Sequence, residues 1–268
     1  MALPVAIQLF TVKPNMENDP RGTLKALKEM GYDGIEPCYG THGMDTDEFV
    51  SLCNELGLTI ISAHVGAGDL VHETDTTLEL YKKMGTSYLV IPALWGDYAM
   101  DGEKHDEVIQ LLKDVAPKYK ENGIQLCYHN HDWEFQKKDG EFLLDRFLNN
   151  FENGEVIPQI DTCWATIGCG NAAEYMKKYS EKCPVLHIKD FYCKGSYLPD
   201  PDHTGEKKPD SFELRPIGYG RNDIHDILDT ALETGVKWVI VEQDTPAFDK
   251  DPLECARLSR QWLKDIGW

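Results

Sequence analysis

Short apolar or β-branched segments alternate with amphipathic stretches from one end of the chain to the other. Strands that alternate in this way with helical stretches are typical of a parallel sheet covered by helices. The pattern predicts strands at 5–9, 34–37, 59–64, 88–92, 124–129, 157–161, 185–189 and 238–242. It predicts helices at 20–30, 46–56, 74–84, 103–121, 142–150, 172–179, 223–233 and 251–264.

Glycines support this division of the chain, because a glycine follows a predicted helix and precedes the next strand at five places. A glycine just after a helix adopts a positive φ at no steric cost, which ends the helix. The eight units predict an α/β fold, a (β/α)₈ TIM barrel, with residues 1–268 forming one domain. An open doubly wound sheet is the alternative, and the lack of Gly-x-Gly-x-x-Gly after the first strand disfavours it. The five glycines are Gly31, Gly57, Gly85, Gly123 and Gly235.

The connection over 190–222 breaks the regular spacing and is rich in Asp, Pro, Gly and Lys. A connection of this length in a compact domain is usually a lid or a binding loop, or else it is disordered. Because it follows the seventh predicted strand, we expect it to form a lid over the catalytic face of the barrel.

Composition narrows the possible partners and the cellular compartment. The chain is 41% hydrophobic and 27% charged, with a formal net charge of -19 that opposes binding to nucleic acid or to anionic membranes. It carries neither a run of about 18 apolar residues nor a basic signal-peptide start, so we expect a cytoplasmic protein. The 8 cysteines include no Cys-x-x-Cys pair, which favours reduced thiols.

Polar residues close the last predicted strands, which is where TIM barrels place their chemistry. Asp161, His187 and Glu242 end three consecutive strands at similar depth, so one cation could contact all three. Each residue also has a structural alternative: Asp161 could cap a helix, His187 could be a hydrogen-bonded core residue, and Glu242 could pair with a buried lysine. The fifth strand adds His129, His131 and Glu134, any of which could complete the coordination. Carboxylates with an imidazole favour Mn²⁺, Mg²⁺ or Co²⁺, with Zn²⁺ also compatible.

Further polar and aromatic residues are expected around the substrate. Polar residues near the first strand ends are predicted to line the cavity, although hydrogen bonding to nearby loops is equally compatible with them. Tryptophans at the same rim could form an apolar wall against a sugar ring, or they could be simple core. The candidates for substrate binding are Gln8, Glu36, His64, Trp95 and Trp133, with Trp164 close to them.

Several motifs together resemble the sugar phosphate isomerase/epimerase family of xylose isomerase-like TIM barrels. They are Ile7-Gln-Leu-Phe-Thr-Val12, Gly31-Tyr-Asp-Gly-Ile-Glu36, Ser62-Ala-His64, Tyr128-His-Asn-His-Asp-Trp-Glu-Phe135, His187-Ile-Lys-Asp190 and Val241-Glu-Gln-Asp244. The resemblance covers nearly the whole chain. The Tyr-His-Asn-His segment is most similar to that of 3-keto-glycoside lyases and inosose dehydratases.

The resemblance implies one divalent metal ion, Mn²⁺ first, held by Asp161, His187, Glu242 and a fourth residue. Many members end the fifth strand in Glu where this chain has His129, so we expect Glu134 as the fourth ligand, with a histidine of that strand as the alternative.

The chemistry implied by this resemblance is enolisation of a keto-sugar. A metal polarises the carbonyl, a base removes the neighbouring proton, and Lys189 neutralises developing oxyanion charge. His129 and His131 are the first candidates for the base, with Glu242 or Glu134 as alternatives. Isomerisation or epimerisation is the expected outcome, and elimination of a β-leaving group, including C-glycoside cleavage, is the alternative.

Two other classes are weaker. An abasic-site endonuclease of this fold needs more histidines and a basic face, and a catalytically silent sugar-binding subunit would not need the ligand set. The expected partner is a small sugar or keto-sugar, while a second copy or a partner subunit remains compatible with the sequence.

Overall fold

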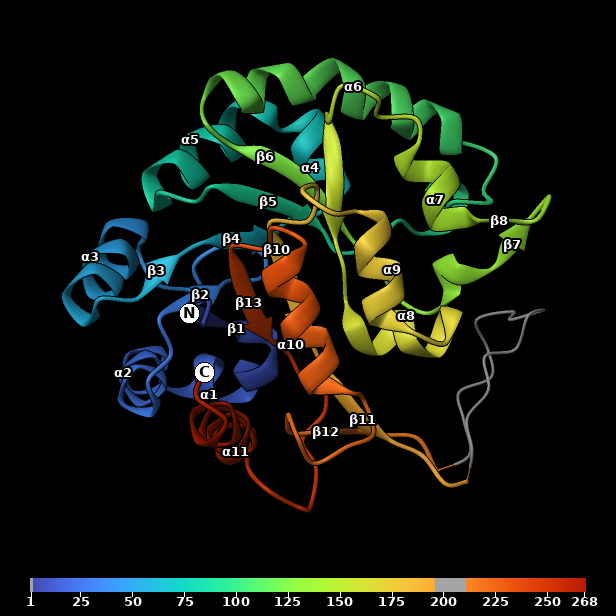
Figure 1. Cartoon of the computed structure of the whole chain (residues 1–268). Coiled ribbons are helices and arrows are strands. Elements are labelled where there is room, and N and C mark those ends of the chain that lie inside the picture. The colour runs from blue at the N-terminus through green and yellow to red at the C-terminus, as the bar shows by residue number, and fades with distance from the viewer. Residues whose placement is uncertain (1, 196–210) are drawn as a thin grey trace.

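A computed structural model describes residues 2–195 and 211–268 of the chain. Parallel strands form the centre and helices surround them, and the labels of the two termini lie next to each other in this view (Figure 1). The barrel strands are β1 (Val5–Gln8), β2 (Gly34–Glu36), β3 (Thr59–Ile60), β4 (Ser62–His64), β5 (Tyr88–Ile91), β6 (Gln125–His129), β9 (Val156–Gln159), β10 (Val185–Ile188) and β13 (Trp238–Val241).

These strands close into a barrel through two sheets and two bridges. One sheet has the order β10-β13-β1-β2-β3 and the other β4-β5-β6-β9. An isolated parallel bridge joins Cys38 to His64, and another joins Asp161 to His187. β3 and β4 are the two halves of the predicted strand 59–64, which is interrupted at Ile61. The predicted TIM barrel is therefore confirmed, with eight strand positions around its wall.

The helices lie on the outside of this barrel (Figure 1). The observed bounds equal the predicted ones for α2, α3 and α5, and the ends of the other predicted helices differ by at most two residues. The helices that the sequence predicts are α2 (Pro20–Met30), α3 (Thr46–Leu56), α5 (Thr74–Met84), α6 (His105–Glu121), α7 (Leu143–Leu148), α9 (Ala172–Lys178), α10 (Ile224–Glu233) and α11 (Pro252–Asp265).

The glycines that the sequence assigns to helix ends behave as expected. Gly31, Gly57 and Gly85 follow α2, α3 and α5 directly, with φ of 94°, 65° and 72°. Gly123 and Gly235 have φ of 78° and 81°. A side chain would be strained in this left-handed region, so glycine ends each helix and lets the chain turn back into the barrel.

Several short elements were not predicted. They are the helices α1 (Lys13–Asn18), α4 (Ala67–His72) and α8 (Thr162–Cys169), the 3₁₀ turns η1 (Leu9–Val12), η2 (Gly96–Tyr98) and η3 (Trp133–Phe135), and two antiparallel hairpins. The hairpins are β7 (Lys137–Lys138) with β8 (Glu141–Phe142), and β11 (Asp190–Tyr192) with β12 (Glu213–Arg215). The second hairpin lies within the connection 190–222, and the central part of the predicted lid, 196–210, falls outside the described residues.

The barrel interior begins with an apolar layer. It consists of one buried side chain from each of six strand positions, packed together with Tyr88, Ile157 and Trp238. A second and larger apolar cluster fills the space between the strands and the helices. The six residues of the interior layer, called the apolar layer below, are Ala6, Ile61, Val90, Cys127, Val185 and Ile240.

A search for membrane-spanning segments among the described residues finds no helix with the required length and apolar character.

Candidate functional site

Polar side chains follow the apolar layer at the next inward position of the strands. Side chains two residues apart on a strand point to the same face, so His129 follows Cys127, His187 follows Val185 and Glu242 follows Ile240. These polar residues are at most 5% exposed. The barrel thus changes from apolar to ionisable within two residues, at the carboxyl ends of its strands.

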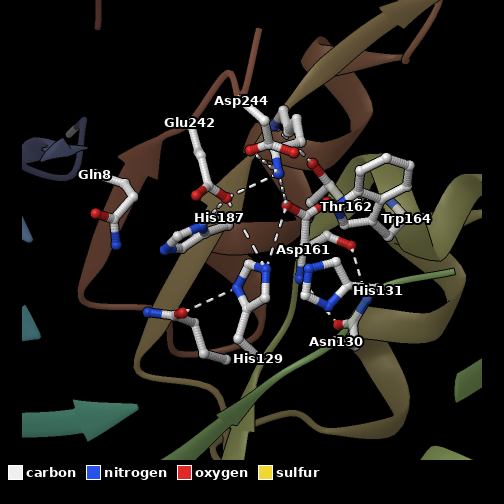
Figure 2. Close-up of polar contacts among 12 residues, drawn as sticks. Gln8, His129, Asn130, His131, Asp161, Thr162, Trp164, His187, Glu242 and Asp244 are labelled. Atoms are coloured by element: carbon white, nitrogen blue, oxygen red, sulfur yellow. Dashed lines mark hydrogen bonds and ion pairs between the residues drawn. The ribbon is translucent and has the colours of Figure 1, made fainter. Parts of the chain in front are cut away.

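These three groups and Asp161 lie close enough to one another to hold one metal ion. Ligand atoms of His129, Asp161, His187 and Glu242 all lie within 4.8 Å of one another and all four residues are buried. Figure 2 shows these side chains converging from neighbouring strands. Two imidazoles and two carboxylates suit a borderline divalent ion such as Mn²⁺, Co²⁺ or Zn²⁺. The donor set therefore fits the metal that the strand-end pattern predicts.

Asp161 uses one carboxylate oxygen to cap a helix and turns the other toward Lys189. Its Oδ1 accepts a 2.9 Å hydrogen bond from the backbone N–H of Trp164 and so caps helix α8. Its Oδ2 accepts no hydrogen bond within the described part of the chain and lies 3.2 Å from Lys189 Nζ. Burial raises the pKa of Asp161 to about 6, although Lys189 opposes the shift. A buried carboxylate oxygen of this kind gains most from a nearby cation.

His187 lies between two carboxylates. Its Nδ1 is 2.9 Å from Glu242 Oε2 and its Nε2 is 2.6 Å from Glu36 Oε1. Burial alone would lower the pKa of His187, but these carboxylates outweigh it and raise the pKa to about 10. The imidazolium therefore supplies a positive charge to the cluster in the metal-free protein.

Lys189 supplies the second buried positive charge. Its Nζ lies 2.8 Å from Glu242 Oε2, 3.0 Å from Asp244 Oδ1 and 3.2 Å from Asp161 Oδ2. Burial lowers its pKa, and the three carboxylates outweigh burial and raise the pKa well above the usual range. Glu242 therefore pairs with a buried lysine, which was its structural alternative, and it also belongs to the candidate metal group.

His129 is held as a neutral imidazole. Its Nδ1 lies 3.1 Å from Gln159 Oε1, and its pKa is well below the usual range, first because it is buried and then because His187 is nearby. A neutral imidazole is the form that binds a metal. His129 also belongs to a second group of possible ligands, with His64 and His187, which overlaps the first.

Glu134 lies elsewhere, although the sequence favours it as the fourth ligand. Within the described residues it is in neither candidate metal group. Its carboxylate accepts hydrogen bonds from Tyr128 Oη at 2.7 Å and from the backbone N–H of His131 at 2.8 Å. In the η3 turn Glu134 is directed to Tyr128, a member of the larger apolar cluster between the strands and the helices, and His129 belongs to the candidate metal group instead. Burial raises the pKa of Glu134 to about 7.

A cavity of about 340 Å³ opens above the metal group. Its lining includes His64, Trp95 and Trp133, which are candidates for substrate binding, and the candidate base His131, together with His129, Lys189, Glu242 and Asp244. The imidazole of His131 stacks on Trp133, with ring centroids 4.1 Å apart and planes 9° apart, and Trp133 contacts Trp95 at 5.2 Å. We call this space the catalytic cavity.

Gln8 and Glu36, also predicted at the cavity wall, lie below it. Both are fully buried and neither is among the residues that line the catalytic cavity. Gln8 Nε2 donates to Glu36 Oε1 at 2.7 Å, and Glu36 also accepts from Gln159 and Ser62. Burial raises the pKa of Glu36, but His64 and His187 outweigh it and hold the pKa well below its usual range. Gln8 therefore holds Glu36, and Glu36 in turn contacts His187 from below the catalytic cavity.

Some functional neighbours escaped the sequence reasoning. Gln159 Oε1 contacts His64 Nε2 at 3.0 Å and His129 Nδ1 at 3.1 Å. Asn130 Oδ1 accepts from the backbone N–H of Asp161 at 3.0 Å and so joins two strand ends. A signal existed for Gln159, because it precedes Asp161 by two residues in an otherwise apolar strand.

Asp190 fixes the backbone that follows Lys189. Its carboxylate accepts four backbone N–H groups, from Phe191, Gly218, Gly220 and Asn222, at 2.8–3.0 Å. Asn222 Nδ2 in turn donates to the carbonyl of Lys189 at 2.8 Å. Lys189 is therefore held by the connection between β12 and α10 as well as by its own strand.

Comparisons with known proteins agree with this architecture. The model of the family described as xylose isomerase-like TIM barrel matches residues 24–266, and the chain belongs to that family. No protein in the comparison with curated sequences matches. The resemblance stated from the sequence motifs is thus confirmed at the level of the family.

Solved structures share the fold at low sequence identity. A sugar phosphate isomerase/epimerase from Parabacteroides distasonis ATCC 8503 is 19% identical over 100% of this chain and 95% of its own, with a TM-score of 0.79. A 3-keto-D-glucoside 4-epimerase from E. coli is 19% identical over 98% of this chain and 99% of its own, with a TM-score of 0.69. A probable 3-DHS dehydratase from Bacillus anthracis is 10% identical over 98% and 99%, with a TM-score of 0.73.

Proposed function

We propose that this protein is a divalent-metal-dependent enzyme that enolises a keto-sugar and reprotonates it as an isomerase or epimerase. The observation that carries the proposal is the buried group of His129, Asp161, His187 and Glu242, of which His129 and Glu242 line the catalytic cavity. A bound divalent ion would supply Lewis-acid polarisation of a substrate carbonyl. The sugar phosphate isomerase/epimerase and the 3-keto-D-glucoside 4-epimerase with this fold support a sugar as the substrate, and the second supports a keto-sugar.

We assign proton transfer to His131. It lines the cavity, it lies outside both candidate metal groups of the described residues, and stacking on Trp133 fixes its ring plane. His129 lies deeper and is a candidate ligand, so it is less suited to act as the base. An imidazole near neutral pH can both remove a proton from a carbon acid and return it.

Lys189 would stabilise the negative charge that develops on substrate oxygen. Its ammonium group lies at the cavity floor, and its three carboxylate neighbours hold its position and its charge. A fixed positive charge at the site of a developing oxyanion lowers the barrier without reorganisation. Glu36 and Glu134 act indirectly in this proposal, since one contacts His187 and the other contacts the backbone of His131.

Elimination of a β-leaving group is the second candidate, because it begins from the same enediolate of the substrate. The probable dehydratase with this fold supports it. The two reactions differ only in the step after proton removal, so product analysis separates them. Reprotonation returns an isomeric or epimeric sugar, whereas elimination releases a second molecule and leaves an unsaturated ketone.

The test is solvent-deuterium exchange into methyl 3-keto-β-D-glucoside, a simple keto-sugar, by the metal-loaded protein. His131→Ala should lower the exchange rate about 10²–10⁴-fold, the usual contribution of a general base, while metal content is unchanged. His187→Ala should lose the metal itself, measured by elemental analysis. The exposed histidine variant His225→Ala is the matched control and should behave like the wild type. Exchange by His131→Ala at the wild-type rate would exclude His131 as the base, and no exchange by the wild type with any keto-sugar, together with no bound metal, would refute the proposal.

A further inference from the structure

A second cavity of about 340 Å³ lies beside the catalytic cavity. The two share four lining residues, Tyr39, Pro92, Ala93 and Trp95, so they are adjoining compartments on the two sides of one wall. The wall comes from the loops after β2 and β5, at the carboxyl ends of these strands. We call this second space the annex.

The lining of the annex differs in chemistry from that of the catalytic cavity. It consists mainly of aliphatic and aromatic side chains, among them Val71, Leu94, Val108 and Leu111. None of the described residues that line it is Asp, Glu, Lys or Arg. The catalytic cavity, in contrast, contains a histidine cluster, Lys189 and carboxylates. Apolar lining with few polar groups is typical of a compartment that binds an apolar ligand group.

The wall between the compartments carries exposed aromatic rings. Tyr39 is 66% exposed and Trp95 is 67% exposed, which is unusual for rings of this size. Tyr39 also has a φ of 55°, and its backbone N–H donates to the carbonyl of His64 at 2.9 Å. A bulky residue held in the left-handed region is strained, and such strain tends to occur where a side chain serves a site. These rings can stack on a ligand that passes from one compartment to the other.

The charges of the catalytic cavity argue against a phosphorylated sugar. Among the described residues that line the two compartments, Lys189 is the only lysine or arginine. Its ammonium group already lies within 3.2 Å of three carboxylates. Phosphate recognition normally uses arginine, lysine or a helix N-terminus directed at the anion. Within the described lining, the catalytic cavity offers a phosphate group only this already paired lysine, and the annex offers no lysine or arginine but only the first turn of the short helix α4, which itself carries Asp69.

From these observations we infer that the substrate is a glycoside with an apolar, preferably aromatic, aglycone: the keto-sugar ring occupies the catalytic cavity and the aglycone occupies the annex. This inference rests on the proposed function and specifies its substrate class. A free monosaccharide or a sugar phosphate would leave the annex unused. An aglycone in the annex would bury apolar surface on both partners, which is the main source of affinity for such a group.

Gly68 offers a way to fill the annex without touching the catalytic cavity. It lies in α4 and lines the annex only. A Cβ added there would meet no atom within 4 Å, and its φ is not positive, so a side chain is sterically compatible. Gly68→Trp should occupy the annex, and Gly68→Ala is the matched control that leaves most of the volume open.

The experiment compares phenyl 3-keto-β-D-glucoside with methyl 3-keto-β-D-glucoside in deuterium exchange and in calorimetric binding to the metal-loaded protein. We expect the phenyl glycoside to bind about tenfold or more tightly to the wild type, as burial of an aromatic ring predicts. Gly68→Trp should remove this preference and change binding of the methyl glycoside less than about twofold, since the annex is not needed for a methyl group. Gly68→Ala should retain the preference.

Two outcomes would overturn the inference. One is equal binding of both glycosides by the wild type, and the other is a preference for the phenyl glycoside that persists in Gly68→Trp. Failure of the inference is distinguishable from failure of the proposed function. If the methyl glycoside exchanges deuterium but the phenyl glycoside binds no more tightly, only the inference fails. If neither glycoside exchanges deuterium, but the phenyl glycoside binds more tightly and loses this advantage in Gly68→Trp, the aglycone site is supported and the proposed reaction fails.

Discussion

The barrel interior has two layers on the same strands, and their side chains are opposite in polarity. The apolar layer, Ala6, Ile61, Val90, Cys127, Val185 and Ile240, contains no ionisable group apart from a buried thiol. The layer above it concentrates carboxylates, imidazoles and an ammonium group in direct contact. The lower layer is stable because nothing in it needs a partner, whereas the upper layer is stable only because each charge has one. The strand period of two residues places one layer directly on the other.

The largest expected effect comes from moving a charge into the apolar layer. Val185→Asp would place a carboxylate among apolar side chains, and an unpaired buried charge of this kind usually costs more than about 4 kcal/mol. We expect loss of the cooperative unfolding transition, measured by circular dichroism and chemical denaturation. Ile240→Val, in the same layer, should cost only about 0.5–1.5 kcal/mol. A folded Val185→Asp protein with the wild-type unfolding midpoint would contradict the contrast between the layers.

A smaller effect is expected at Glu134, which supports the backbone of His131 from outside the catalytic cavity. Glu134→Gln replaces a carboxylate that accepts from two donors with an amide that can accept through only one oxygen. The loss should be about 1–3 kcal/mol in the free energy of unfolding, the usual cost of an unsatisfied buried donor. Deuterium exchange should slow because His131 is less well positioned, while metal content stays at the wild-type level. The exposed Glu152→Gln is the control, and metal loss in Glu134→Gln would instead make Glu134 a ligand.

The smallest effect is expected beneath the ligands. Ser62→Ala removes the hydroxyl that donates to Glu36 Oε2, but the same oxygen still accepts from Gln159 Nε2 at 2.7 Å. We expect a cost of about 0.5–1.5 kcal/mol in the free energy of unfolding, the net value of one hydrogen bond, with unchanged metal affinity. Denaturation and a metal titration would measure the two quantities. A loss of several kcal/mol would mean that the carboxylate of Glu36 depends on each donor separately.

The fold was largely predictable because its signals are local and repeated. The helices α2, α3 and α5 begin and end where their amphipathic pattern and terminal glycines predict. Helix α8 was missed because it is mostly buried on all sides, so its sequence lacks the alternation of apolar and polar faces. The interruption at Ile61 was also missed, since an apolar run shows no mark of a break in pairing.

The site was predictable in its composition but less so in its arrangement. The sequence places Asp161, His187 and Glu242 at the ends of three consecutive predicted strands. Because the parallel strands of a TIM barrel end at the same face, these side chains were expected to meet there. Glu134 follows its strand by a turn, and the direction of a turn depends on contacts such as the one with Tyr128. The depth of Gln8 and Glu36 depends in the same way on partners far along the chain. The spacing of residues along the sequence therefore predicts which side chains come close together more reliably than it predicts which carboxylate belongs to the candidate metal group.

The cage of four backbone N–H groups around Asp190 has a consequence for engineering. Because one carboxylate anchors the segment 218–222, this loop and Lys189 form a single transferable unit rather than a free loop attached to a scaffold. A loop transplanted from a relative that lacks the aspartate would lose its attachment points, and the ammonium group at the cavity floor would lose part of its support. Redesign of the rim is therefore better directed to the loops after β2 and β5, which carry the exposed rings of Tyr39 and Trp95.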